Sequence, residues 1–180
     1  MPRIPYPDVG GLPETAQKIL AGTPLNVVRI GAVASLPLFE AQGRLSYAIA
    51  DPQVLEPRVR EAAILRVAHL SNSAYELHHH RPLARGAGLT DDDLAAIERR
   101  AYHLLDPTLA AVCRFTDEVV LDLAPSDETL AALRALVSDQ VVVNLILAAG
   151  CYMTVARLIA ATGIELDETP LEQLTTGHGA

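Results

Sequence analysis

The residues best suited to chemistry lie in one short segment, SNSAYELHHHRP at residues 71–82, which holds three of the six histidines. On a helix of about 3.6 residues per turn, Glu76 and His80 lie on one face, about 40° apart around the axis. A carboxylate and an imidazole so placed can donate and accept protons near neutral pH. His78 points away from Glu76, so the three histidines are not expected to converge on one ion.

The spacing leaves other roles open for the same residues. Ser73 and Glu76 are spaced as a capping box, in which the serine hydroxyl accepts from the third helical amide and the glutamate reaches back. His78 and His79 fit half-exposed surface positions, and His80 fits a buried histidine with satisfied hydrogen bonds. A glutamate and a histidine at i and i+4 could also share a metal ion.

The elements that carry this segment are predicted to be helices. Apolar residues follow a helical period after Pro57, proline or hydroxyl and acidic residues stand at the expected helix starts, and no convincing strand appears. The sequence predicts an all-α single-domain helical bundle of about six to eight helices. We expect helices over residues 36–49, 58–70, 73–86, from 90, over 107–123, from 126, and over 139–162.

Length and proline content predict how the chain is divided. The 180 residues fit one domain. Eight of the 12 prolines fall in the first 57 residues. We expect an extended N-terminal wrapping segment with short helices at 1–35, a helical domain at 36–167, and a C-terminal tail at 168–180.

Charge and cysteine content exclude some function classes. A net charge of −8 disfavours nucleic acid and membrane surfaces as partners. Cys113 and Cys151 lie in apolar stretches and are expected to be ordinary core residues of a cytoplasmic protein. The first residues show no basic segment followed by an apolar one, so we do not expect secretion. Residues 141–162 approach the length of a membrane span, but Asn144 and Arg157 interrupt them, so we expect burial in the core or in a subunit interface.

Several spaced runs resemble one known family. These are REAAILRVAH at 60–69, SAYELHHH at 73–80, LARGAGL at 83–89 and GCYMTVAR at 150–157. Together they resemble the carboxymuconolactone decarboxylase and alkylhydroperoxidase-D-like superfamily over residues 25–167. The resemblance implies a helical fold of the alkylhydroperoxidase-D-like type. It also implies a homotrimer or homohexamer with the site near subunit contacts, although a dimer is an alternative.

The resemblance also points to site residues. In the peroxidase branch the corresponding helix carries Cys-x-x-Cys-x-x-x-His, with a glutamate on the preceding helix. Here Ser73 and Glu76 stand at the two cysteine positions, Glu61 at the glutamate and His80 at the histidine. A hydroxyl and a carboxylate cannot form a disulfide, so a thiol peroxidase cycle is unavailable at these positions.

The remaining polar groups define the leading hypothesis. The resemblance implies Glu61, Glu76 and His80 as the catalytic set of a cofactor-independent acid/base enzyme, of decarboxylase, lyase or isomerase type. Its expected partner is a small polar metabolite, with no metal or other cofactor. Because two nearby carboxylates cannot both ionise cheaply, one of the two pKa values should rise. The candidate substrate-binding residues are Ser73, Tyr75 and His79, although Tyr75 also fits a core position.

Two alternatives come from other classes of protein. One is a metal-binding enzyme that uses Glu61, Glu76 and His80 as ligands. The other is a relative of the peroxidases that has lost its redox cysteines and acts as a non-catalytic binding oligomer. In every case, an antiparallel turn at residues 71–72 predicts that Glu61 and His80 lie close together.

Overall fold

The computed structural model of the chain describes residues 2–172, and all regular secondary structure within that range is helical. This confirms the all-α fold. The described residues form nine α-helices rather than six to eight, because two short helices lie in the N-terminal segment. The helices are α1 (Glu14–Gly22), α2 (Asn26–Gly31), α3 (Leu36–Ala50), α4 (Pro57–Leu70), α5 (Ala74–Gly86), α6 (Asp91–Arg99), α7 (Pro107–Leu121), α8 (Asp127–Arg134) and α9 (Asp139–Thr162). Short 3₁₀ turns occur at Val9–Gly11 and Tyr102–Leu104.

The helix starts follow the capping residues in the sequence. Thr90 forms a complete capping box with Asp93 at the start of α6. Ser126 and Ser138 accept hydrogen bonds from backbone amides in the first turns of α8 and α9. At its other end, α9 stops at Gly163, whose φ of 65° lies in the left-handed region that favours glycine.

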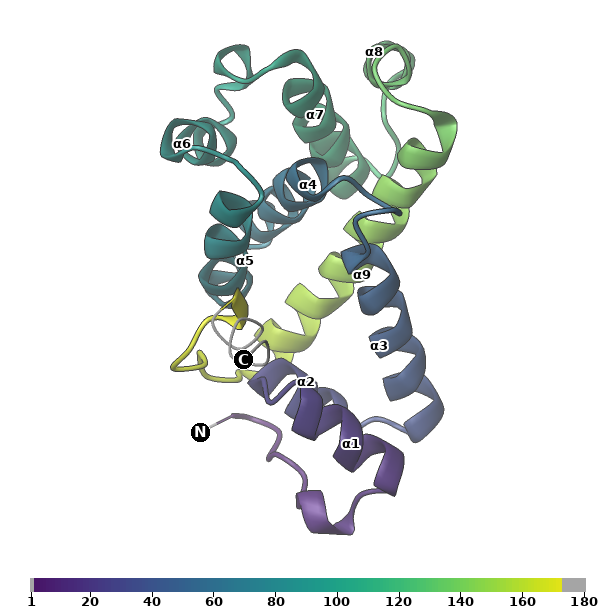
Figure 1. The fold of residues 1–180 in the computed structure, drawn as a ribbon, viewed down its shortest axis with the longest axis vertical. Coiled ribbons are helices and arrows are strands. Elements are labelled where there is room, and N and C mark those ends of the chain that lie inside the picture. The colour runs from purple at the N-terminus through teal and green to yellow at the C-terminus, as the bar shows by residue number, and fades with distance from the viewer. Residues whose placement is uncertain (1, 173–180) are drawn as a thin grey trace.

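The N-terminal segment packs as a small unit at one end of the molecule (Figure 1). Ala16 and Leu20 of α1 form an apolar cluster with Ala32 and with Phe39 of α3. Residues 2–8 contain no helix. Most of the predicted tail at 168–180 falls outside the described residues.

Helix α4 is the centre of the fold. It packs against α5, α7 and α9, and every residue from 61 to 68 is buried. A helix buried on all sides normally carries apolar residues. This one nevertheless contains Glu61 and Arg66, each about 1% exposed. Two charged groups therefore have to find partners inside the protein.

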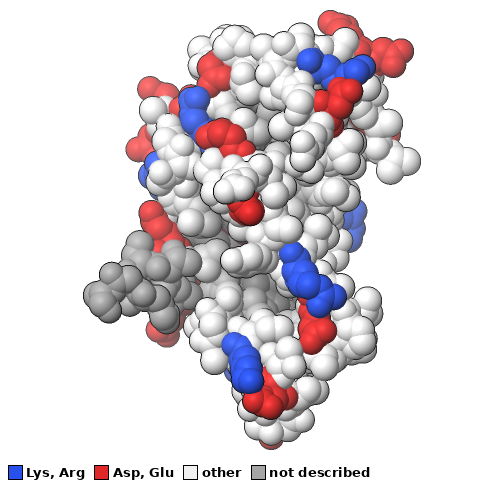
Figure 2. Space-filling view, turned by 45° about the vertical axis from the view of Figure 1, so that its right-hand side comes forward, with Lys and Arg blue, Asp and Glu red and all other residues white. Residues whose placement is uncertain are grey.

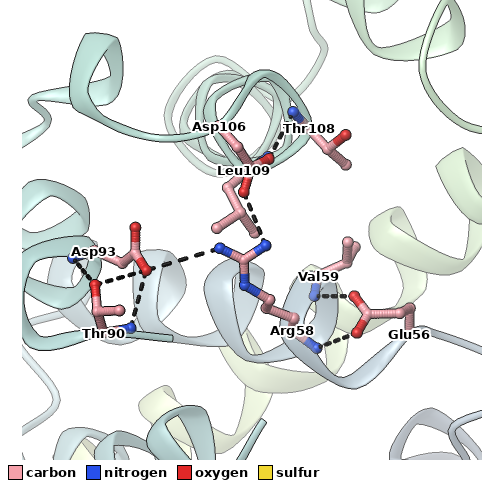
Figure 3. Close-up of polar contacts among 8 residues, drawn as sticks. All are labelled: Glu56, Arg58, Val59, Thr90, Asp93, Asp106, Thr108 and Leu109. Atoms are coloured by element: carbon pink, nitrogen blue, oxygen red, sulfur yellow. Dashed lines mark hydrogen bonds and ion pairs between the residues drawn. The ribbon is translucent and has the colours of Figure 1, made fainter. Parts of the chain in front are cut away.

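An arginine at the start of α4 links three helix N-termini (Figure 3). Arg58 lies 2.9 Å from Asp106, which caps α7, and 3.8 Å from Asp93 of the α6 capping box. Glu56 caps α4 itself by accepting hydrogen bonds from the amides of Arg58 and Val59. The acidic caps suit the positive ends of the helix dipoles, and they fix how α4, α6 and α7 meet.

Helix α9 runs diagonally across the molecule from α8 towards α2 (Figure 1). Within the described residues it is the one helix long and apolar enough to cross a membrane, by length and composition only. A core helix meets the same criterion, and α9 packs along α4 and α7. It is therefore not clear evidence of a membrane span.

Candidate functional site

The α4–α5 hairpin brings the candidate acid/base residues together. Asn72 adopts a φ of 49° in the tight turn between the helices, and Ser73 accepts a hydrogen bond from the amide of Glu76 at 3.4 Å. The two helices run antiparallel after this turn. Glu61, early on α4, consequently lies beside His80, which is midway along α5, and the contact that the sequence predicted between them is present.

Glu61 is held between a histidine and an arginine. Its Oε2 lies 2.8 Å from Nδ1 of His80, and its Oε1 accepts a hydrogen bond from Nε of Arg60 at 2.9 Å. Burial alone would raise the pKa of Glu61, but His80 and Arg60 outweigh it and hold that pKa below its usual range. An ionised Glu61 accepts the Nδ1 proton of His80, which leaves Nε2 of the imidazole for another partner.

Glu76 has the opposite environment. It is about 2% exposed, and neither carboxylate oxygen has a hydrogen-bond partner among the described residues. Burial raises the pKa of Glu76 to about 7, against smaller opposing effects of Ser73 and His80. The predicted capping box is therefore only half formed, since the serine accepts but the glutamate does not reach back.

The two carboxylates thus differ in protonation near neutral pH. Glu61 is a paired anion, whereas Glu76 keeps its proton over much of the range below pH 7. Environments that push apart the pKa values of neighbouring groups are typical of acid/base sites. The sequence predicted that one of the two pKa values would rise because the carboxylates repel each other, but the cause at Glu76 is burial rather than the charge of Glu61.

Tyr152 was not among the predicted site residues. Its ring meets the imidazole of His80 edge to face, with centroids 5.0 Å apart and the planes at 85°. The signal for it was the run at 150–157 that carried part of the family resemblance, but nothing in that run showed that Tyr152 faces His80. Helix α9 therefore contributes a third wall to the site.

Tyr75 and His79 lie on a neighbouring face of α5, and they contact Asp167 rather than Glu61. Both reach Asp167 beyond α9: the phenol of Tyr75 donates to Oδ2, and Nε2 of His79 lies 3.1 Å from the same atom. Nδ1 of His79 accepts from the amide of Leu171 at 3.0 Å. His79 is buried, so the half-exposed alternative for this residue is wrong.

Asp167 was also missed, because it lies 88 positions from His79 in the chain and outside any motif. Its Oδ1 accepts from the amide of Asn26 at the start of α2. The substrate-binding role predicted for Tyr75 and His79 remains a prediction. Their hydrogen bonds in this structure are made with the protein itself.

No group of three His, Cys, Asp or Glu side chains is arranged to hold a metal ion within residues 2–172. The donors at the site fit proton transfer more directly. They comprise an ionised carboxylate on a histidine and a protonated carboxylic acid one turn away on α5.

Comparisons with known proteins agree with the resemblance seen in the sequence. Residues 37–118 match the model of the Carboxymuconolactone decarboxylase family. This match supports the resemblance of the chain to the carboxymuconolactone decarboxylase and AhpD-like superfamily. No curated protein matches it.

Two solved structures show the fold of this superfamily. An uncharacterised peroxidase-related protein with an alkylhydroperoxidase AhpD core, from Ralstonia eutropha JMP134, is 15% identical with a TM-score of 0.78, and the match covers 93% of each chain. A protein of unknown function from Agrobacterium tumefaciens, named as a candidate AhpD antioxidant defence protein, is 22% identical with a TM-score of 0.68. That match covers 77% of this chain and 96% of the other.

The candidate site of this chain contains no cysteine. Its two cysteines, Cys113 and Cys151, are free and buried elsewhere. Burial raises the pKa of Cys113 to about 12, so that thiol stays protonated. Cys151 accepts a hydrogen bond from Gln42 at 3.1 Å. Both cysteines occupy the core positions that the sequence predicted.

Proposed function

We propose that this protein is a cofactor-independent acid/base enzyme, of decarboxylase, lyase or isomerase type, that acts on a small polar metabolite. The observation that carries the proposal is the 2.8 Å hydrogen bond between Glu61 and Nδ1 of His80, beside the unpartnered carboxyl of Glu76. A carboxylate that orients a histidine in this way is a recurring arrangement for a general base.

The residues have distinct roles in this proposal. His80 uses Nε2 to take a proton from the substrate, and Glu61 stabilises the imidazolium that forms. Glu76 supplies a proton or a hydrogen bond to the group that gains negative charge. Arg60 keeps Glu61 ionised, since it donates to Oε1. No step requires a thiol, which is consistent with Ser73 and Glu76 at the cysteine positions.

The small number of aromatic residues supports a small substrate. The chain has five tyrosines, two phenylalanines and no tryptophan. Of the tyrosines, Tyr75 and Tyr102 already donate to Asp167 and Asp117. Large aromatic ligands usually bind pockets rich in such side chains. A compact, oxygen-rich metabolite suits this chain better.

The test is a turnover assay on a panel of β-keto acids and carboxylated lactones, followed by ¹H NMR and release of CO₂. His80→Asn and Glu61→Gln should each lower kcat/KM by at least about 10²-fold. Glu98→Gln is the matched control, because Glu98 is exposed and pairs only with Arg81 in the described residues. Equal rates for all four proteins would contradict the proposal.

The names of the structural neighbours raise a second candidate, a role related to peroxides. Both neighbours are named for alkylhydroperoxidase or antioxidant functions. The peroxidase chemistry needs thiols that this site lacks. A protein of this kind with a role related to peroxides would therefore bind its ligand without catalysing a reaction. Binding of a substrate without turnover would favour it.

We also propose that the protein forms a closed homo-oligomer, a trimer or hexamer in preference to a dimer. Three large apolar residues of α9, Val143, Ile146 and Leu147, are 54%, 43% and 51% exposed, and Tyr47 of α3 is 82% exposed. Figure 2 shows broad uncharged areas between small, mostly paired groups of charged residues. Exposed apolar surface of this kind supports contact with another copy of the chain.

Light scattering after size exclusion tests this assembly. The expected mass is a multiple of three times 19.2 kDa. Leu147→Glu should lower it. A monomer at micromolar concentration would contradict the proposal.

The free cysteines fit a reducing compartment, and we propose a cytoplasmic location on that ground.

A further inference from the structure

The chain beyond α9 lies against α5 and is held by hydrogen bonds more than by burial. We call residues 164–172 the strap. None of these nine residues is buried, and Leu166 is 52% exposed. Figure 1 shows this end of the chain, in yellow, beside α5. Because the strap removes little apolar surface from water, its position depends on a small number of polar contacts.

The strap has two anchors, and both use the ring of His79. The inner anchor is Asp167, which accepts a hydrogen bond from the phenol of Tyr75 and lies 3.1 Å from Nε2 of His79. The outer anchor is the backbone amide of Leu171, which donates to Nδ1 of His79 at 3.0 Å. The two nitrogens of one imidazole therefore hold two different parts of the strap.

These contacts fix the tautomer of His79. A backbone amide can only donate, so Nδ1 must be unprotonated to accept from Leu171. A neutral imidazole carries one ring proton, which therefore lies on Nε2 and is donated to Asp167. Protonation of Nδ1 would point one N–H at another and break the outer anchor. The inner anchor would gain instead, since an imidazolium donates to a carboxylate more strongly than a neutral ring does.

The surroundings of His79 keep its ring neutral at pH 7. Burial has the largest effect and lowers the pKa of His79. Asp167 raises that pKa by a smaller amount, and the charges that His78 and His80 can carry lower it again. The ring therefore gains its second proton in acid, below its ordinary pKa of 6.5. The outer anchor is present at pH 7 and above, and it is lost as the pH falls.

Other ionisable groups surround this contact. Tyr75, whose ring centroid lies 4.6 Å from that of His79, keeps its proton because burial raises its pKa. The one charged residue of α2 is Arg29, whose guanidinium lies over the ring of Tyr6 at 4.3 Å. The remaining groups are the carboxyls of Glu76 on α5 and of Glu165, Glu168 and Glu172 on the strap. Glu76 has a pKa of about 7, so an experiment must separate its titration from that of His79.

We propose that the strap is a pH-sensitive latch, in which protonation of His79 releases Leu171 and opens residues 168–172 while Asp167 keeps the inner part of the strap on α5. This inference does not depend on the proposed reaction. The strap also forms one wall of a surface cleft of about 480 Å³, opposite Tyr6 and Arg29. Opening of the latch would therefore change this cleft and expose the Nδ1 edge of His79.

The latch couples two quantities that can be measured separately. Because the amide of Leu171 binds only the neutral ring, closure of the strap lowers the pKa of His79, and protonation weakens closure to the same extent. One hydrogen bond of this kind contributes about 0.5–1.5 kcal/mol. Closure should therefore lower the pKa of His79 by about 0.5–1, which corresponds to an outer anchor about 3–10-fold weaker in acid.

The first experiment compares Leu171→Ala with Leu171→Pro. Alanine keeps the backbone amide, whereas proline has no N–H to donate. An NMR titration of the His79 ring should give a pKa about 0.5–1 higher in Leu171→Pro than in Leu171→Ala. In the natural protein at pH 8, ¹⁵N spectra should show an unprotonated Nδ1 and a protonated Nε2. Equal pKa values in the two variants, or a proton on Nδ1 at pH 8, would overturn the latch.

The second experiment follows the strap by hydrogen–deuterium exchange. Protection of residues 168–172 is measured at pH 8 and at one pH unit below the pKa found for His79, each time relative to a synthetic peptide of residues 164–172. The natural protein should lose protection about 3–10-fold in acid, whereas Leu171→Pro should show low protection at both pH values. His103→Asn is the control, because His103 is an exposed histidine far along the chain from the strap.

Three results of the second experiment would overturn the latch. One is protection of residues 168–172 that stays constant while His79 titrates. Another is a loss of protection that extends at the same pH to the buried residues 61–68 of α4, because that would be acid unfolding of the whole protein. The third is a pH response that disappears in Glu76→Gln, since it would assign the switch to Glu76. A response that persists in Glu76→Gln and in His103→Asn supports His79.

Discussion

Helix α4 carries two buried charged residues, Glu61 and Arg66, and their surroundings differ. Around Arg66 all the strong donors and acceptors are matched: Asp117 accepts from Nε and Nη2 of Arg66 at 2.9 and 2.7 Å, and the carbonyl of Ile97 accepts from Nη1. Asp117 also accepts from Arg100 and Tyr102. We call Arg66, Arg100, Tyr102 and Asp117 the closed cluster.

The group around Glu61 is not matched in the same way. We call Glu61, Glu76, His80 and Tyr152 the open cluster, because Glu76 has no hydrogen-bond partner in the described residues and Nε2 of His80 faces none. Both clusters lie beside the same helix, and all of their members are buried except Arg100, which is exposed, and Tyr152, which is half-buried. A complete network stabilises the fold, whereas an incomplete one has a cost that a ligand can remove. The comparison separates a structural role from a functional one.

The largest effect is expected from breaking the closed cluster. Asp117→Asn leaves Arg66 as a buried charge without a full partner, so it should lower the free energy of unfolding by about 3–5 kcal/mol. Urea denaturation at pH 7 measures this. Glu14→Gln removes an exposed ion pair with Lys18 and should change stability by less than about 1 kcal/mol.

Should Asp117→Asn fail to fold, Tyr102→Phe gives the same answer on a smaller scale. It removes one hydrogen bond to Asp117 and should cost about 1–2 kcal/mol. A closed cluster whose members can be replaced without loss of stability would not be a structural network, and the comparison would fail.

In the open cluster, substitution of Glu76 should raise the free energy of unfolding rather than lower it. Glu76 has a folded pKa of about 7, above its ordinary value of 4.5. The folded state therefore holds an extra proton between these values, and stability falls as pH rises through that window. Glu76→Gln cannot ionise, so it should be more stable than the natural protein by about 1–3 kcal/mol at pH 8, with little difference at pH 4.

Urea denaturation at several pH values checks this, with Glu98→Gln as the exposed control. The same Glu76→Gln variant should lose turnover by at least about 10²-fold, because it removes the acid proton. A variant that is less stable than the natural protein at pH 8 would show that Glu76 is held by partners after all.

The sequence predicted the elements well and the site in part. Caps such as Thr90 and Ser138 are local signals, so helix starts could be placed from them. The Glu61–His80 contact followed from an antiparallel turn. Tyr152 and Asp167 reach the α5 residues from distant parts of the chain. Only tertiary packing determines which side chain a distant helix presents, and no spacing rule encodes it.

A smaller effect is expected at the cap of α5. Ser73→Ala removes the hydroxyl that accepts from the amide of Glu76, so it should cost about 0.5–2 kcal/mol in thermal or urea unfolding. Thr90→Ala is the matched comparison, because Thr90 takes part in a complete capping box. We expect Thr90→Ala to cost at least as much. A clearly larger cost for Ser73→Ala would assign Ser73 a further contact within the open cluster.

The last prediction concerns the reduction of hydroperoxides, for which we expect no activity. By resemblance, Ser73 and Glu76 stand at the two positions where the peroxidase branch carries thiols, and burial raises the pKa of the Cys113 thiol to about 12. Thiolates, not thiols, attack peroxides. Consumption of a small alkyl hydroperoxide with a dithiol donor should therefore match the rate in buffer, and Cys113→Ala and Cys151→Ala should leave it unchanged. A fast reaction that either substitution abolishes would place redox chemistry in the core and remove the basis for an acid/base site.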